Sequence, residues 1–100
     1  MPSFGSPFSG LANDRKLTNQ ELIRAIRFTV ASEYEANQLY VQLAESTDDK
    51  LAIAVLMDIA GEELRHAGQF LRLLYKLAPE EEKLYALGAK EVEKAIESSK

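Results

Sequence analysis

The sequence predicts an all-α protein: an antiparallel hairpin of two long helices plus a short C-terminal helix, with two hairpins dimerising into a four-helix bundle. Three observations support this fold class. Apolar residues recur at steps of three and four over two long segments, no strand pattern or internal repeat occurs, and capping signals mark where the segments begin. A hairpin of this length has a single seam, so we expect its remaining apolar surface to be covered by a second copy.

The chain begins with a segment that does not fit a helix. Residues 1–16 contain two prolines, two glycines and three serines, a composition typical of a flexible arm. Phe4 and Phe8 could dock this arm on a partner, and a disordered tail is the alternative. We therefore expect a flexible N-terminal arm at 1–16 and a helical hairpin domain at 17–100.

Local signals place the two long helices at about 19–45 and 49–77. Thr18 followed by Glu21 matches the capping-box pattern at the first helix start. The turn Ser-Thr-Asp-Asp at 46–49 offers a Thr or Asp cap for the second helix. This helix is expected to stop at Ala78, because the residue before a proline disfavours the α region.

A shorter third helix is expected at 79–97. Pro79 suits the first helical position, and the acidic residues at 80–82 suit the positive end of the helix dipole. Its apolar stripe is thinner and consists of Leu84, Leu87, Val92 and Ile96. We expect this stripe to pack on one end of the bundle or on a further copy.

Composition excludes several classes of protein. A chain of 100 residues with 46% hydrophobic and 28% charged residues makes one small globular domain. The absence of cysteine excludes disulfides, cysteine–zinc sites and thiol catalysis. No long apolar run or signal-peptide pattern is present, so we expect no membrane span and a cytoplasmic location. A net charge of −4 with mixed acids and bases gives no nucleic-acid-binding stripe.

Ionisable residues interrupt the apolar stripes of both long helices. The stripe of the second helix reads Ala52, Leu56, Ile59, Glu63, His66, Phe70, Leu73 and Leu77, and that of the first reads Leu22, Ile26, Val30, Glu33 and Tyr40. Burying an unpaired carboxylate is costly, so the acids in these stripes require a compensating partner.

Chain geometry brings the interrupting residues to one level. Glu33 lies about 15 residues before the centre of the turn and Glu63 about 15 residues after it, so each is roughly 22 Å from the turn. His66 lies one helical turn beyond Glu63 on the same face. The hairpin should therefore bring these three side chains together.

The motif at 63–66 indicates which group compensates the buried charges. Glu63-Leu64-Arg65-His66 is a Glu-x-x-His motif, and ferritin-like di-iron sites combine two such motifs with one glutamate from each of two further helices. One chain supplies Glu33, Glu63 and His66, so two chains complete the set. Carboxylates stabilise Fe(III) and bridge metals, and two Fe(II) ions can pass two electrons to dioxygen. The sequence thus predicts a ferroxidase with two iron ions per dimer interface, and manganese also fits these ligands.

Other interpretations remain open at this point. His66 could be a core imidazole satisfied by one hydrogen bond, and the buried acids could form a structural salt network with Arg27 or Arg65. Tyr40 could be a packing residue or could donate a hydrogen bond to a ligand carboxylate. The whole chain could then be a non-catalytic helical dimerisation module. Alternatively, the di-iron site could belong to a peroxide reductase like rubrerythrin.

Longer segments carry a resemblance to a known family. The segments SEYEANQLY (32–40) and IAGEELRHAGQFLRLL (59–74), the turn between them and the Pro-Glu-rich start of the third helix resemble encapsulated ferritin-like proteins, over roughly residues 11–92. The resemblance implies a ferroxidase centre at a dimer interface, an annular homo-decamer, and Fe(II) oxidation inside an encapsulin nanocompartment in the cytoplasm.

The resemblance also assigns roles to individual residues. It places metal ligands at Glu33, Glu63 and His66, a tyrosine near the site at Tyr40, and a carboxylate of a secondary metal-entry site at Glu35. Ser32 stands where some members have another acid, which weakens the prediction of an entry site. The chain ends in Glu-Ser-Ser-Lys rather than in the usual Gly/Ser/Leu-rich loading peptide.

Overall fold

The computed structural model describes residues 15–100 and is all-helical over that range. Its helices are α2 (Asn19–Glu45), α3 (Lys50–Leu77) and α4 (Pro79–Ser98). Each bound lies within one residue of the expectation from the sequence. The predicted hairpin with a C-terminal helix is therefore confirmed, and dimerisation stays a prediction. Most of the expected N-terminal arm, residues 1–14, lies outside the described residues.

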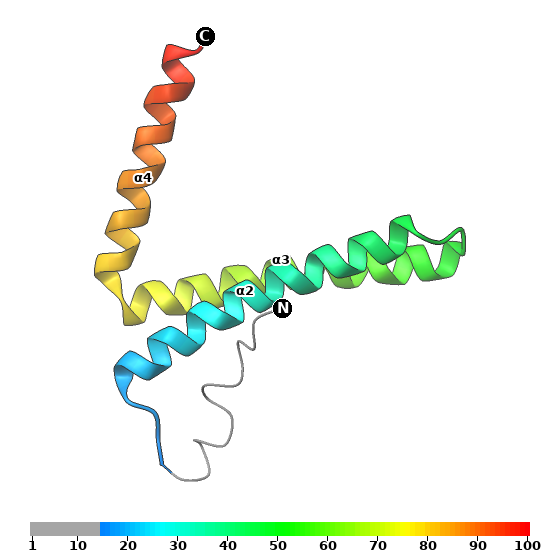
Figure 1. Ribbon diagram of the computed structural model, residues 1–100, viewed down its shortest axis with the longest axis horizontal. Helices are drawn as coiled ribbons and strands as arrows, with labels where there is room; N and C mark the ends of the chain where they lie inside the picture. The colour runs from blue at the N-terminus through cyan, green and yellow to red at the C-terminus, as the bar shows by residue number, and fades with distance from the viewer. Residues whose placement is uncertain (1–14) are drawn as a thin grey trace.

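The described part of the chain has the shape of an L (Figure 1). Helices α2 and α3 run antiparallel side by side, and α4 stands away from them after a bend at Ala78 and Pro79, here called the elbow. The molecule measures 51 × 46 × 22 Å along its principal axes, and no residue of α4 is buried. Most of the surface of α4 is thus left uncovered by the other described residues of the chain.

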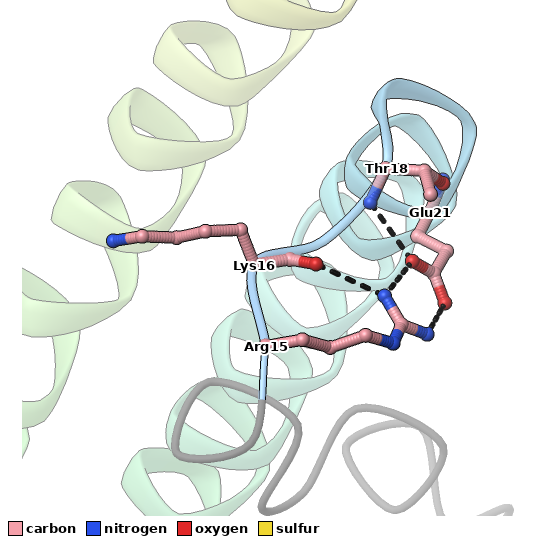
Figure 2. Close-up of polar contacts among 4 residues, drawn as sticks. All are labelled: Arg15, Lys16, Thr18 and Glu21. Carbon is pink, nitrogen blue, oxygen red and sulfur yellow. Dashed lines mark hydrogen bonds and ion pairs between the residues drawn. The ribbon is translucent and has the colours of Figure 1, made fainter.

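The start of α2 is fixed by the capping box that the sequence predicted (Figure 2). The Thr18 hydroxyl accepts a hydrogen bond from the Glu21 backbone N–H (3.2 Å), and the Glu21 carboxylate accepts one from the Thr18 N–H (2.8 Å). Arg15 donates two further bonds of 2.7 Å to the same carboxylate. The bonds from Arg15, followed by the bond from Thr18, lower the pKa of Glu21 to about 2.

The turn between the long helices also uses a side-chain cap. Asp49 precedes the first residue of α3, and its carboxylate accepts a hydrogen bond from the Ala52 N–H at 2.9 Å. The Thr47 hydroxyl accepts a bond from the Asp49 N–H at 3.2 Å. The cap of α3 is therefore the aspartate rather than the threonine of the two candidates.

The seam between α2 and α3 is lined by apolar residues, with small side chains on the α3 side. The buried residues are Ile23, Ile26, Val30, Ala44, Ala60, Ala67 and Leu74. The apolar stripe expected for the second long helix lies beside this seam, because its residues Ile59 and Leu73 keep 38% and 42% of their surface exposed. Ala60 and Ala67 of α3 face α2, because two closely spaced helix backbones leave little volume between them. The larger residues of the stripe flank the seam and stay partly uncovered in one chain.

A polar cluster ties α4 to the hairpin at the elbow. The Arg27 guanidinium of α2 donates to both Glu81 carboxylate oxygens, at 3.1 and 2.5 Å for Oε1 and 3.2 Å for Oε2. The Tyr85 hydroxyl donates to the same carboxylate, and its ring lies 5.8 Å from that of Tyr75. The bonds from Arg27 lower the pKa of Glu81, and the bond to Glu81 raises the pKa of Tyr85 to about 12.

Within residues 15–100, no helix combines the length and the apolar character needed to cross a lipid bilayer.

Candidate metal centre

Glu33, Glu63 and His66 meet at the edge of the hairpin seam, as the sequence predicted. The His66 Nδ1 atom lies 3.6 Å from Oε2 of Glu33 and 3.7 Å from Oε2 of Glu63. One ligand atom from each residue lies within 4.8 Å of the other two. Side chains that are thirty residues apart in the sequence therefore form one compact group.

The packing of the hairpin explains why the three side chains converge. Ala60 lies three residues before Glu63, and Ala67 directly follows His66. Both alanines lie on the seam side of α3 and are almost fully buried against α2. Their small size lets α2 approach α3 at the level of the cluster. Asn37 of α2 reaches across at the same place and donates a hydrogen bond of 2.8 Å from its amide nitrogen to the Ala60 carbonyl.

The cluster is partly buried and poorly compensated. The side chains of Glu33 and Glu63 are 18% and 17% exposed, and that of His66 is 38% exposed. Oε2 of Glu33 is buried and has no hydrogen-bond partner in the part of the chain that the structure describes. The pKa of Glu33 is raised, first by a hydrogen bond that the Glu63 carboxyl makes with its protonated form, then by burial and by charge repulsion from Glu63. Such a group is stabilised by a proton or by a metal cation.

The arginines considered as counter-ions are engaged elsewhere. Arg27 pairs with Glu81 at the elbow, and Arg65 pairs with Glu62, the acid that precedes Glu63. His66 contributes a charge only when it is protonated. Within residues 15–100, the two arginines considered for a structural salt network therefore pair with other acids. Carboxylate oxygens with an imidazole nitrogen make a donor set that suits iron or manganese.

Glu35 and Tyr40 lie outside the compact group. Glu35 follows Glu33 by two residues, so it projects about 200° away around the helix. Among the described residues, the carboxyl of Glu35 is absent from the group of potential ligands, and its buried Oε2 atom has no hydrogen-bond partner. Tyr40 is half-buried and lies two helical turns beyond Glu33, toward the turn of the hairpin. The roles expected for these two residues stay predictions.

Comparison with known proteins identifies the family. The family model described as Rubrerythrin matches residues 24–99, which is most of the chain. The protein belongs to the rubrerythrin family of ferritin-like proteins. Members of this family bind iron, and the three-residue group of this rubrerythrin-family chain offers carboxylate and imidazole ligands for it.

Two curated relatives of this rubrerythrin-family chain are named as encapsulin-associated proteins. It is 40% identical over 76 residues to the encapsulin nanocompartment cargo protein EncC of Myxococcus xanthus, covering 76% of the chain and 58% of that protein. It is 37% identical over 68 residues to a ferritin-like–encapsulin shell fusion protein of Pyrococcus furiosus, covering 68% of the chain and 20% of that protein. The chain thus spans between a fifth and three fifths of the length of these curated relatives.

A solved structure shares the fold. The crystal structure of the encapsulated ferritin domain from Pyrococcus furiosus matches with a TM-score of 0.78 and 34% identity, over 80% of this chain and 82% of that one. The resemblance to encapsulated ferritin-like proteins that the sequence indicated is therefore confirmed.

Proposed function

We propose that two copies of the chain pair through the hairpin face that carries Glu33, Glu63 and His66, and that the joint site oxidises Fe(II) to Fe(III). The observation that carries this proposal is the convergence of the three side chains around a buried carboxylate oxygen that finds no hydrogen-bond partner within residues 15–100. One chain supplies half of the ligand set of a ferritin-like di-iron site, so the other half must come from a second copy.

The protein side of the reaction is electrostatic. Glu33 and Glu63 each bring a negative charge to the pair of chains, giving four carboxylates that balance two divalent ions. The His66 imidazole must be neutral to bind metal, and its position between the two carboxylates orients the ring toward the site. When bound, a pair of iron ions supplies two electrons for the reduction of dioxygen.

The test is aerobic Fe(II) oxidation followed by the absorbance of the Fe(III) product. Glu33→Ala, Glu63→Ala and His66→Ala should each slow the reaction by at least about tenfold, because each removes a ligand from both halves of the site. Glu62→Ala is the matched control: this acid is adjacent in sequence and pairs with Arg65 outside the cluster. Equal rates in the wild type and all four variants would contradict the proposal.

We extend the proposal to the assembly. The relatives are named as an encapsulin cargo protein and as a fusion to an encapsulin shell. We infer that this chain forms dimers that assemble into an annular decamer, and that the assembly delivers Fe(III) inside an encapsulin nanocompartment in the cytoplasm. Co-expression with an encapsulin shell protein, followed by isolation of the shells, should recover the chain in the shell fraction. Its absence there would contradict the shell partnership and leave the ferroxidase proposal standing.

The family name supports a second candidate function. Because the matching family model is that of Rubrerythrin, the same site could reduce hydrogen peroxide in place of dioxygen. Anaerobic addition of hydrogen peroxide to the Fe(II)-loaded protein distinguishes the two oxidants, since a peroxide reductase should react faster with peroxide than with dioxygen.

Elemental analysis of the purified protein separates iron from manganese. A stable dimer without metal would favour the non-catalytic dimerisation module.

A further inference from the structure

Asn37 places a polar side chain at a seam whose buried residues are all apolar. Among residues 15–100, no polar or charged residue is buried, and Asn37 is half-buried between the two long helices. Its amide nitrogen donates a hydrogen bond of 2.8 Å to the carbonyl oxygen of Ala60 on α3. A carbonyl oxygen can only accept, so the nitrogen rather than the oxygen of the amide must face α3.

This hydrogen bond lies about one helical turn from the candidate metal ligands. Asn37 follows Glu33 by four residues, or about 6 Å along α2, and Ala60 precedes Glu63 by three residues, or about 4.5 Å along α3. Because the helices are antiparallel, both displacements point toward the turn of the hairpin. The bond therefore joins the two helices next to the cluster and at nearly the same offset from each carboxylate.

Register matters more at the cluster than elsewhere along the seam. Apolar contacts are not directional, and the small side chains of Ala60 and Ala67 resist sliding less than large interlocking ones would. A slip of one helical turn would move Glu33 by about 5.4 Å relative to α3. The three ligand atoms lie within 4.8 Å of one another, so such a slip would disperse them.

We propose that Asn37 is a positioning residue for the metal centre: its hydrogen bond to the Ala60 carbonyl fixes the register of α2 against α3, so that Glu33 meets Glu63 and His66. The inference rests on the proposed function, because it assigns Asn37 a role toward bound metal. Asn37 itself is not a ligand in this proposal. It acts through the backbone of α3, in the way that outer hydrogen bonds orient the ligands of other metal sites.

The test uses Co(II) as a spectroscopic probe on the metal-free full chain. The wild type, Asn37→Leu, Asn37→Ala and the control Gln38→Leu are titrated with Co(II) and followed by visible absorption, and their thermal unfolding is measured in parallel. Leucine keeps the approximate size of asparagine and favours a helix, but it offers no donor. Gln38 is the exposed neighbour on the same helix, so its variant controls for an added leucine.

We expect Asn37→Leu and Asn37→Ala to remain folded, to bind Co(II) about 10–100-fold more weakly and to show an altered absorption band. Gln38→Leu should match the wild type. Wild-type Co(II) binding by Asn37→Leu would overturn the positioning role and leave the proposed function intact. If Asn37→Leu fails to fold, Asn37→Ala decides by the same criterion, and failure of both to fold would overturn a role local to the site. A wild type that binds no Co(II) would overturn the proposed function and the positioning role with it.

Discussion

Glu33 combines burial with a like charge nearby, which sets its behaviour in the absence of metal. Its pKa is raised by the neighbouring Glu63 carboxyl and by burial, and one of its oxygens has no hydrogen-bond partner among residues 15–100. A group whose pKa is raised on folding binds its proton more tightly in the folded state. Its contribution to stability is therefore present below its unfolded pKa and is lost as the pH rises through its folded pKa.

We therefore expect Glu33→Gln to stabilise the metal-free protein at pH 7. The gain should be about 0.5 kcal/mol, the magnitude of a close like-charge pair, and it should vanish below a pH of about 4. Thermal unfolding of the chelator-treated protein across this pH range measures it. Glu62→Gln should give no gain, because Glu62 is paired with Arg65. A Glu33→Gln variant that is less stable than the wild type at neutral pH would contradict the prediction. Added metal should reverse the order by stabilising only the wild type.

The elements are held at their ends by side chains that the sequence places there. At the start of α2, Thr18 and Glu21 satisfy each other's backbone N–H groups, and Arg15 adds two bonds to the Glu21 carboxylate. The capping box could be predicted from the sequence, because Thr18 and Glu21 are only three residues apart. The polar cluster at the elbow joins Arg27 to Glu81, which are 54 positions apart, and no local sequence pattern indicates this contact.

The cap of α2 predicts part of the acid sensitivity of the fold. The pKa of Glu21 is lowered to about 2, so the carboxylate stabilises the folded state above its unfolded pKa and loses that effect as the pH falls toward 2. Glu21→Gln should therefore flatten the loss of stability between a pH of about 4.3 and 2. Helix content followed by circular dichroism during acid titration tests this. An unchanged titration curve would contradict it, and Glu97→Gln serves as the control at the exposed end of α4.

The polar cluster at the elbow should stabilise the attachment of α4 to the hairpin. Tyr85→Phe removes the hydrogen bond to Glu81 and keeps the ring against Tyr75, whereas Arg27→Ala leaves Glu81 without its cation. A loss of about 1–2 kcal/mol for Arg27→Ala should raise amide hydrogen exchange in the first turns of α4 by roughly 5–30-fold. Exchange at the buried seam of α2 and α3 should stay unchanged. Lys83→Ala, which breaks an exposed pair with Glu80, is the control.

Residues 15–100 of a single chain leave two surfaces uncovered. Helix α4 buries none of its residues, and the stripe of the hairpin beside the candidate metal centre keeps Ile59 and Leu73 partly exposed. Most helical stability in proteins comes from the packing of an apolar face, and no residue of α4 is buried within residues 15–100. Both surfaces are consistent with the proposed assembly from several copies, in which the stripe beside the cluster forms the dimer face.

The proposed dimer face predicts a difference between two variants of α3. Ile59 lies four residues before Glu63 on the same face, whereas Leu64 lies about 200° around the helix from His66. Ile59→Lys should weaken dimerisation and metal binding together, and Leu64→Lys should leave the metal-dependent dimer intact. Mass measured by light scattering, with and without added metal, compares them. A metal-dependent dimer of normal stability in Ile59→Lys would contradict the proposed face.

Features of the fold that depend on local geometry could be predicted from the amino-acid sequence. Capping patterns and the Pro79 stop gave the helix bounds, and the count of residues from the turn placed Glu33 level with Glu63 and His66. These predictions succeed because the rise of a helix and the reach of a cap are the same in every protein.

The groups that fill the space between the helices could not be predicted in this way, because they depend on how the two helices pack. Periodicity gives the angle of a residue around its helix but not the neighbour it meets, so the sequence placed Ile59 and Leu73 where the structure packs Ala60, Ala67 and Leu74. The bond from Asn37 to a backbone carbonyl and the pairing of Arg27 with Glu81 were invisible for the same reason. Each joins groups far apart in the chain, and packing rather than local pattern brings them within bonding distance.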